Sequence, residues 1–558
     1  MRFTRREALK LAAALPLGAA LAGPGCPSPA PPAGARRLRG GIIGAADDRG
    51  HRLLRDGGGR EAASDPAPAV RTGVAIVGAG VAGLSAAWRL RRAGFEDLVV
   101  LELEDRPGGT SAFGENEVSA YPLGAHYLVT PPPEARGLRL LLEDLGVITG
   151  YDAAGRPDYR ADAIVAAPVE RLFVDGRWID GLYPRPGATA GDLAQLEAFE
   201  AEIARLARFR DGRGRRAFAL PRAAGSDAPE VLALDRLSMA AWLAEKGLLG
   251  SARLRWFVEY ACRDDYCARL ETTSAYAGLH YFLARAGEDR DPDHAPYTLA
   301  WPEGNGRFVR RLVEPLRDRL RTGVVVTEVR EERDGVVLRA HDVAAARAFE
   351  VRAKAAVIAC PLLVAARLLA PLRPDAARAA AASLEYGSWL VGNLIVSRRP
   401  GGPGAPLSWD NVLFESDSLG YVHATHARPR PDGRAVLTYY LPFPDADGGA
   451  ARRRLLETTF EGWADRILAD LGRAHPDIRE TALELVLWRW GHAMVRPRPG
   501  LFTGDALGRA GAPSAGGRAR VACADMSGLP LFEEAHYRGV LAAEETLRAL
   551  GRRVESVL

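Results

Sequence analysis

The sequence predicts an α/β fold in which a Rossmann-like domain is interleaved with an α+β domain built from an antiparallel sheet and helices. An apolar run of strand type, residues 74–77, passes through a glycine turn into a helix pattern. A second strand–acid–helix pattern lies close to the C-terminus, so the Rossmann-like domain draws on both ends of the chain. Helical and alternating patterns fill the region between them, and 558 residues exceed one ordinary domain.

The first glycine turn has the spacing of a dinucleotide-binding loop. Gly78 permits the tight turn, and Gly80 lets a pyrophosphate approach the backbone. Gly83 allows the following helix to pack close to the strand. Ala82 lies in the first helical turn, whose N–H groups would point at the phosphates. We therefore expect these four residues to bind a dinucleotide.

The segment after the second strand indicates which dinucleotide. The apolar strand 98–101 ends at Glu102, about 20 residues downstream, where an acid for ribose hydroxyls is expected. The run from Glu102 to Thr110, E-L-E-D-R-P-G-G-T, resembles the flavin-containing amine oxidase and phytoene desaturase superfamily. The resemblance implies FAD as cofactor and ribose binding by Glu102. It also implies phosphate or flavin-side contacts by Arg106, Gly108, Gly109 and Thr110.

The C-terminal region matches the same superfamily. A short buried strand, residues 520–524, ends in Asp525, and a helix pattern follows over 532–543. The resemblance implies that Asp525 takes a ribityl hydroxyl. The helix start would face the pyrimidine edge of the flavin through Phe532, Glu533 and Glu534, where a positive dipole end favours the reduced cofactor. A generic amphipathic terminal helix is the alternative.

The middle of the chain supplies the second domain and further candidates. Helical spacing occurs over 134–147, 190–209, 236–261 and 271–286, and a helix is expected over 451–472. Alternating strands within 388–440 predict the antiparallel sheet that floors the substrate site in related enzymes. The resemblance also implies cofactor contacts for Val326 and Cys360.

These patterns divide the chain into seven predicted segments. They are an export signal (1–26), a linker or extension (27–70), a first FAD-binding segment (71–130), a mainly helical first substrate-domain segment (131–300), a second FAD-binding segment (301–375), a second substrate-domain segment with the sheet and a helix (376–490), and a third FAD-binding segment (491–558).

Three polar residues are the catalytic candidates. Many amine-oxidising relatives place a lysine–water pair beside flavin N5, and here that position is Asn393, which puts oxygen-using amine oxidation in doubt. His492 and His536 are the most plausible acid–base groups, although each taken alone fits a structural histidine better. Seven aromatic residues are candidates for the pocket wall, and we expect two or three of them to line the pocket: Tyr266, Tyr281, Trp301, Trp389, Trp409, Trp490 and Tyr537.

The N-terminus predicts export. Arg5 and Arg6 precede a short apolar run, residues 11–23, which is too short to span a bilayer. The pair resembles a twin-arginine signal, so export machinery is an expected partner and the location is periplasmic or extracellular. An ordinary secretory signal is the alternative, and lipid anchoring at Cys26 is a minor one. No second stretch has transmembrane length.

Composition excludes little but favours a small-molecule enzyme. The net charge of +4 is weakly basic, and the arginine clusters lack interleaved aromatic residues, so nucleic acid is not an expected partner. No cysteine pair has zinc spacing with histidines, so no metal site is expected. Cys262 and Cys267 fit either a disulfide or two buried thiols.

The sequence therefore predicts an exported FAD-dependent oxidoreductase that passes a hydride from a small organic substrate, best an amine, to flavin N5. Oxygen, a quinone or a redox protein would then accept the electrons. A desaturase, isomerase or porphyrinogen-type oxidase acting on a hydrophobic polyene or ring is the alternative within enzymes. An electron-transfer or interaction module that retains FAD is the alternative from another class.

Export should depend on the guanidinium groups of the arginine pair. Replacing Arg5 and Arg6 with lysine keeps the charge but removes the planar forks that a twin-arginine receptor would distinguish from ammonium groups. We expect flavin-loaded precursor to accumulate in the cytoplasm, measured by fractionation and immunoblotting. Unimpaired secretion of the double variant would indicate an ordinary secretory route.

Overall fold

The computed structural model describes residues 38–46, 48–51, 67–285, 297–370, 379, 382–445, 447–505, 507–508 and 516–558. The predicted export signal lies outside the described residues. Residues 39–558 form one compact unit. Within the described residues, no helix has both the length and the apolar character needed to cross a membrane.

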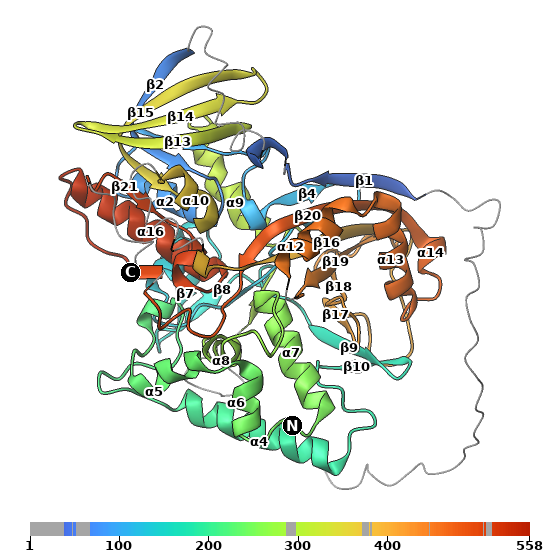
Figure 1. The fold of residues 1–558 in the computed structure, drawn as a ribbon. Coiled ribbons are helices and arrows are strands. Elements are labelled where there is room, and N and C mark those ends of the chain that lie inside the picture. The colour runs from blue at the N-terminus through green and yellow to red at the C-terminus, as the bar shows by residue number, and fades with distance from the viewer. Residues whose placement is uncertain are drawn as a thin grey trace, which may run out of the picture. The chain divides into compact units, whose positions relative to one another are not determined.

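A seven-stranded sheet forms the centre of the Rossmann-like domain (Figure 1). Parallel pairing joins β12, β3, β2, β15 and β21, while β13 and β14 extend the sheet as an antiparallel meander from β15. The strands are β2 (Ala67–Val77), β3 (Leu98–Leu101), β12 (Leu320–Arg321), β13 (Val324–Glu332), β14 (Gly335–Asp342), β15 (Arg347–Ile358) and β21 (Ala519–Val521). Strands from three distant regions therefore build one sheet, which confirms the predicted interleaved α/β fold.

Two helices from opposite ends of the chain pack together on this sheet. Helix α2 (Val81–Arg92) follows the glycine turn, and α16 (Phe532–Ala549) packs against it. A Cβ on Gly539 would lie 2.1 Å from the carbonyl oxygen of Ala82, so only glycine permits this approach. The apolar side chains of both helices join one core with the sheet. Helices α9 (Gly306–Val313) and α10 (Leu362–Leu368) belong to the same domain.

The second domain contains an eight-stranded sheet in the order β1-β20-β16-β19-β18-β17-β9-β10. Its strands are β1 (Arg39–Gly44), β9 (Glu170–Val174), β10 (Arg177–Asp180), β16 (Tyr386–Val396), β17 (Asp410–Leu413), β18 (Tyr421–His423), β19 (Ala435–Phe443) and β20 (Ala482–Val495). The predicted antiparallel core is confirmed in β16, β18, β19 and β20.

The structure adds strands from two other predicted segments to this sheet. β9 and β10 come from residues 131–300, which were predicted to be mainly helical, and β9 pairs in parallel with β17. β1 comes from residues 27–70, which were predicted to be linker, and pairs in parallel with β20. These edge strands are short, so their own sequence patterns are weak and their pairing depends on the sheet already formed by later residues.

Helices of the second domain gather around a separate apolar core. They are α4 (Ala190–Ala207), α5 (Pro229–Leu232), α6 (Met239–Glu245), α7 (Ala252–Tyr266) and α8 (Ala275–Leu283). The apolar residues of α3 (Arg136–Asp144) join the core of the Rossmann-like domain instead, and α12 (Gly448–Glu457) contacts β16 and β20. The next helices along the chain are α13 (Phe460–Gly472) and α14 (Ile478–Thr481). The helix predicted over 451–472 is two helices. Thr459 accepts a hydrogen bond from the Gly462 N–H at 3.2 Å and thereby begins α13 anew.

Short elements complete the fold. Three two-stranded sheets join β4 (Phe113–Glu115) to β5 (Ala120–Pro122), β6 (Leu128–Val129) to β11 (Thr298–Leu299), and β7 (Ile148–Tyr151) to β8 (Pro157–Tyr159). The 3-10 helices that concern the site are η1 (Gly109–Ser111), η5 (Glu314–Leu316) and η6 (Ala524–Ser527).

Candidate active site

The first glycine turn brings backbone against backbone. Gly78 has φ +101°, and a Cβ there would lie 2.6 Å from the carbonyl oxygen of Ala359 in the loop after β15. A Cβ on Gly83 would lie 1.9 Å from the carbonyl oxygen of Gly78. Gly80 precedes α2, and no side chain caps that helix. The N-terminal N–H groups of α2 are therefore available to bind an anion.

Glu102 is fixed beside this turn. One carboxylate oxygen accepts the Ala79 N–H at 2.7 Å, and the other accepts the Glu104 N–H at 2.9 Å. Burial is the main cause that raises the pKa of Glu102 to about 7. The carboxyl group is thus oriented by the turn itself, which is the placement predicted for a ribose acid.

The second pair of glycines faces the first turn. Gly108 has φ +125°, and its N–H donates to the carbonyl oxygen of Ala79 at 2.8 Å. A Cβ on Gly109 would lie 3.2 Å from the Cα of Gly80. The two loops therefore form one glycine cradle without side chains between them, which fits a pyrophosphate.

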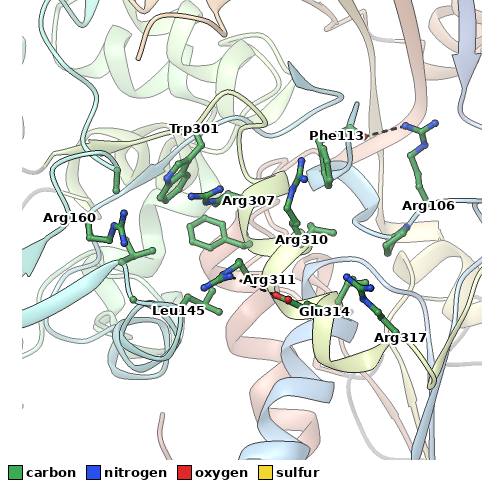
Figure 2. A pocket seen from close by; sticks show the side chains of 17 residues that line it. Arg106, Phe113, Leu145, Arg160, Trp301, Arg307, Arg310, Arg311, Glu314 and Arg317 are labelled. Carbon is green, nitrogen blue, oxygen red and sulfur yellow. Dashed lines mark hydrogen bonds and ion pairs between the residues drawn. The ribbon is translucent and has the colours of Figure 1, made fainter. Parts of the chain in front are cut away.

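Arg106 points away from this cradle. Its guanidinium donates to the carbonyl oxygen of Phe113 at 3.2 Å and lies 5.4 Å from the centroid of the Trp488 ring. Arg106 lines a cavity of about 650 Å³ together with Arg160, Arg307, Arg310, Arg311 and Arg317 (Figure 2). Four of those arginines form ion pairs: Arg160 with Asp162 at 2.8 Å, Arg307 with Glu303 at 3.3 Å, Arg310 with Glu115 at 3.1 Å, and Arg311 with Glu314 at 3.7 Å. These ion pairs offset most of its positive charge, so we assign no anion site there.

The C-terminal acid joins three segments. The Asp525 carboxylate accepts the Leu362 N–H at 2.8 Å and the Tyr386 hydroxyl at 2.6 Å. Burial raises its pKa. Cys360 lies two residues before Leu362, and burial raises the pKa of its thiol to about 12, so it is a neutral thiol. Val326 lies on β13, and its side chain is buried in the apolar core.

A cavity of about 450 Å³ lies between walls from the two domains. Thr110, Phe532 and Glu533 line it from the FAD-binding segments. The aromatic residues in its wall are Tyr127, Tyr260, Tyr281, Phe282, Trp389, Trp409, Tyr440 and Trp490, and His126 lies among them. Tyr281, Trp389, Trp409 and Trp490 were predicted wall residues, whereas Tyr266, Trp301 and Tyr537 do not line this cavity.

The cavity wall also offers unpaired polar atoms. Asn305 is 1% exposed, its side-chain N–H donates to the carbonyl oxygen of Tyr127 at 3.0 Å, and its side-chain oxygen has no partner within the described residues. The indole N–H of Trp389 also has no hydrogen-bond partner within the described residues. Buried polar groups are normally hydrogen-bonded, so these atoms indicate a bound group. Together with the glycine cradle and the two acids, they fit FAD with its flavin end at this cavity.

The fold and the site thus define an FAD-dependent oxidoreductase. Bound FAD would supply the two-electron acceptor, while the chain binds and orients the substrate. The chain belongs to the family of flavin-containing amine oxidoreductases, whose sequence profile matches residues 81–517. No curated protein sequence matches it.

Solved structures share the fold at low sequence identity. Putrescine oxidase bound to putrescine is 18% identical, with a TM-score of 0.62, and the match covers 87% of this chain and 100% of that one. Cyclohexylamine oxidase from Brevibacterium oxydans IH-35A is 19% identical, with a TM-score of 0.61, and the match covers 86% and 100%. A fatty acid isomerase from P. acnes is 17% identical, with a TM-score of 0.56, covering 84% and 97%.

The three predicted catalytic residues do not line this cavity. The ring of His536 accepts or donates a hydrogen bond with the Ser85 hydroxyl at 3.0 Å, at the α2–α16 interface. Asn393 donates to the carbonyl oxygen of Pro122 at 3.0 Å and accepts from the Thr438 hydroxyl at 2.8 Å. The side chains of His536 and Asn393 are both buried, and each forms hydrogen bonds to a neighbouring element of the fold. His492 lies 5.9 Å from the Tyr386 ring, and burial lowers its pKa to about 4, so it is neutral.

Sequence reasoning missed the charged residues of the cavity. Glu170, Asp264, Asp265 and Asp410 line it together with Arg285. Asp264 and Asp265 lie in the sequence between Cys262 and Cys267. Both cysteines are free and buried, and Cys267 donates its thiol to the carbonyl oxygen of Ser388 at 3.3 Å.

Removing Glu102 should release FAD more readily than removing Glu104. Glu102→Ala deletes the carboxylate that the turn orients toward ribose, which costs roughly 1–3 kcal/mol of binding, or about 5- to 100-fold in affinity. Glu104→Ala is the comparison variant: it removes the neighbouring half-buried carboxylate, which accepts from the Ala46 N–H at 3.0 Å, but keeps that of Glu102, so its effect should be the smaller of the two. The measurement is FAD affinity of each variant by flavin fluorescence. Equal affinity in both would contradict the ribose assignment.

Proposed function

We propose that the protein oxidises an amine that carries a second amino group, which stays protonated as ammonium in the cavity, as in a diamine or polyamine. In this reaction the carbon next to nitrogen would lose a hydride to bound FAD, which supplies the two-electron acceptor, and the nitrogen lone pair becomes part of the C=N bond of an iminium product. The observation that carries the proposal is the charge of the cavity: five carboxyl groups line it, and Arg285 is its only cation among the described residues.

Arg285 balances two of the carboxylates. It lies 3.4 Å from Asp265 and 3.9 Å from Glu533. Glu170, Asp264 and Asp410 form no ion pair within the described chain. Because unpaired charge is costly in a partly desolvated site, the half-buried Asp264 and Asp410 favour either protonation or a bound cation, and the more exposed Glu170 adds a further negative charge beside them. An ammonium group in the cavity would satisfy them.

The three unpaired acids lie close together. Asp410 and Glu170 are register partners on the parallel strands β17 and β9. Asp410 also interacts with Asp264, which raises the pKa of Asp410 after burial, the larger cause. The neighbouring hydroxyls of Tyr260 and Tyr127 act in the opposite direction and lower the pKa values of Asp410 and Asp264, respectively. We name Glu170, Asp264 and Asp410 the acid cluster.

The acid cluster suits the end of the substrate that is not oxidised. Hydride loss requires a neutral nitrogen with a free lone pair, whereas a carboxylate beside that nitrogen would hold it as ammonium. β17 lies three strand steps from β16, which carries Trp389, so the two are roughly 14 Å apart along the sheet. A long amine can therefore place one nitrogen near the flavin end and keep the other charged at the acid cluster.

The aromatic walls support the same substrate. His126, 4.6 Å from the Tyr440 ring, has its pKa lowered to about 3 by burial and adds no positive charge. Aromatic rings contact both alkyl chains and ammonium groups favourably. The structural similarity to putrescine oxidase, which was solved with putrescine bound, agrees with a diamine. A polyene or porphyrinogen would leave the acid cluster without a partner.

Two further proposals concern the cell. We infer export through the twin-arginine route, because the arginine pair precedes a short apolar run and folded, cofactor-loaded proteins use that route. Oxygen, a quinone or a redox protein would take the electrons. The position of Asn393, bound to Pro122 and Thr438, leaves the choice of acceptor to other residues.

Neutralising the acid cluster should distinguish a diamine from a monoamine. Asp410→Asn keeps the size but removes the charge, so we expect KM for an alkyl diamine to rise about 10- to 100-fold, the effect of losing a charged hydrogen bond of roughly 1.5–3 kcal/mol. KM for a monoamine of equal chain length should change little. Exposed Glu415→Gln, beyond the end of β17, is the control. A similar loss for both substrates would argue against a second ammonium subsite.

Binding of a dication should strengthen as pH rises through about 7. Burial and the charge of Asp265 raise the pKa of Asp264 to about 7, so below this pH the carboxyl is neutral and above it the carboxylate attracts cations. A bis-quaternary ammonium inhibitor does not itself titrate, so its Ki isolates the protein groups. We expect Ki to fall as pH rises from about one unit below this pKa to about one unit above it, and the dependence to weaken in Asp264→Asn. A flat profile in the unmodified protein would contradict the assignment.

A further inference from the structure

Residues 39–51 lie outside the stretch of the chain that matches the family profile, yet they contact both domains. β1 adds a parallel strand to the edge of the eight-stranded sheet and runs along β20 (Figure 1). Beyond β1, the Ala45 N–H donates to the carbonyl oxygen of Arg489 at 3.3 Å. We name residues 39–51 the strap, of which the structure describes all but residue 47.

One end of the strap is bound to the loop that follows the ribose acid. The Ala46 N–H donates to the Glu104 carboxylate at 3.0 Å. Arg49 forms a two-pronged ion pair with Asp105, at 2.7 and 2.8 Å. The Glu104 N–H in turn donates to Glu102 at 2.9 Å. Glu104 therefore connects the strap to Glu102.

The other contacts of the strap lead toward the ribityl acid. The His51 ring lies 6.3 Å from that of His492, and His492 lies 5.9 Å from Tyr386. The Tyr386 hydroxyl donates to Asp525 at 2.6 Å. A short chain of contacts thus joins the strap to each of the two acids that fit FAD, although Glu102 and Asp525 belong to opposite ends of the chain.

The packing of the strap leaves little room for change. Gly44 lies against the face of Trp488, where a Cβ would come within 2.4 Å of the ring. Gly40 has φ +124°, and a Cβ there would lie 1.8 Å from the carbonyl oxygen of Leu485. In contrast, a Cβ on Gly41 would meet nothing within 4 Å. The pairing of β1 with β20 therefore requires glycine at positions 40 and 44.

We propose that the strap belongs to the FAD site and slows release of the cofactor by holding the loops of Glu102 and Asp525 in position. It acts through Glu104, Asp105 and the His492–Tyr386 pair, so its residues are positioning residues. Groups that are held in the bound conformation before binding lose less freedom on binding, which favours retention of the ligand. The strap also joins the second domain's sheet to the FAD-binding loop, so both must separate for that end of the site to open.

Adjacent glycines give a matched test in the full-length protein loaded with FAD. Gly40→Val breaks the pairing of β1 through the clash with Leu485, whereas Gly41→Val alters the neighbouring position without contact. The measurement is the rate at which free FAD fluorescence appears after dilution. We expect release about tenfold faster in Gly40→Val, since about 1.4 kcal/mol corresponds to a factor of ten, and unchanged release in Gly41→Val.

A second pair of variants leaves the strand intact. Arg49→Ala removes the ion pair with Asp105, and we expect release about two- to fivefold faster, in keeping with about 0.2–1 kcal/mol for an exposed ion pair. Arg430→Ala, which removes an ion pair with Asp432 at 2.9 Å, is the control and should release FAD at the unmodified rate. Circular dichroism and the melting temperature of each apoprotein report folding separately from cofactor retention.

The outcomes separate the possibilities. Faster release in Gly40→Val and Arg49→Ala, with apoprotein melting temperatures like those of their controls, supports the strap as a component of the FAD site. Release equal to the unmodified protein in both variants overturns the proposal. Equally fast release in Gly41→Val or Arg430→Ala also overturns it, because the effect would then not depend on the contacts that define the strap.

Discussion

The close backbone approach at the first glycine turn is the constraint on which the rest of the structure depends. A side chain at Gly83 would occupy the place of the Gly78 carbonyl oxygen, and one at Gly78 would press on Ala359. The same turn provides the Ala79 N–H that orients Glu102 and the carbonyl group that receives Gly108. Because these contacts involve backbone, they fix the distance between the phosphate cradle and the ribose acid without relying on side-chain rotamers.

This local unit becomes a site only when distant segments return to it. β15 and β21 complete the parallel sheet beside β2, and α16 packs on α2 through Gly539. Asp525 then joins Leu362 to Tyr386, a residue of the other domain's sheet. The domains are therefore bound to one another at the cofactor, which explains why the chain crosses between them several times.

Sequence predicted those features of the site that depend on local geometry. Gly78, Gly80, Gly83 and Glu102 follow from spacing along one strand–turn–helix unit, and the structure places them as expected. The acid cluster could not be found in this way, because Glu170, Asp264 and Asp410 lie on β9, α7 and β17 and meet only after folding. His536 lies away from the cavity for a related reason: an α-helix has several faces, and this residue is on the one that packs against Ser85.

The proposed diamine substrate would place two electrostatic demands on the cavity that a single amine nitrogen does not combine. A nitrogen that gives up electrons must be neutral, so its surroundings should be aromatic and free of unpaired carboxylates. A charged group that anchors the substrate needs carboxylates, which are costly to bury unless a cation accompanies them. The cavity wall carries Trp389 and Trp490 on β16 and β20 and Asp410 on β17 of the same sheet, which is compatible with the proposed separation of these demands. In this proposal, the length of the substrate decides whether one nitrogen can lie near the flavin end while the other lies at the acid cluster.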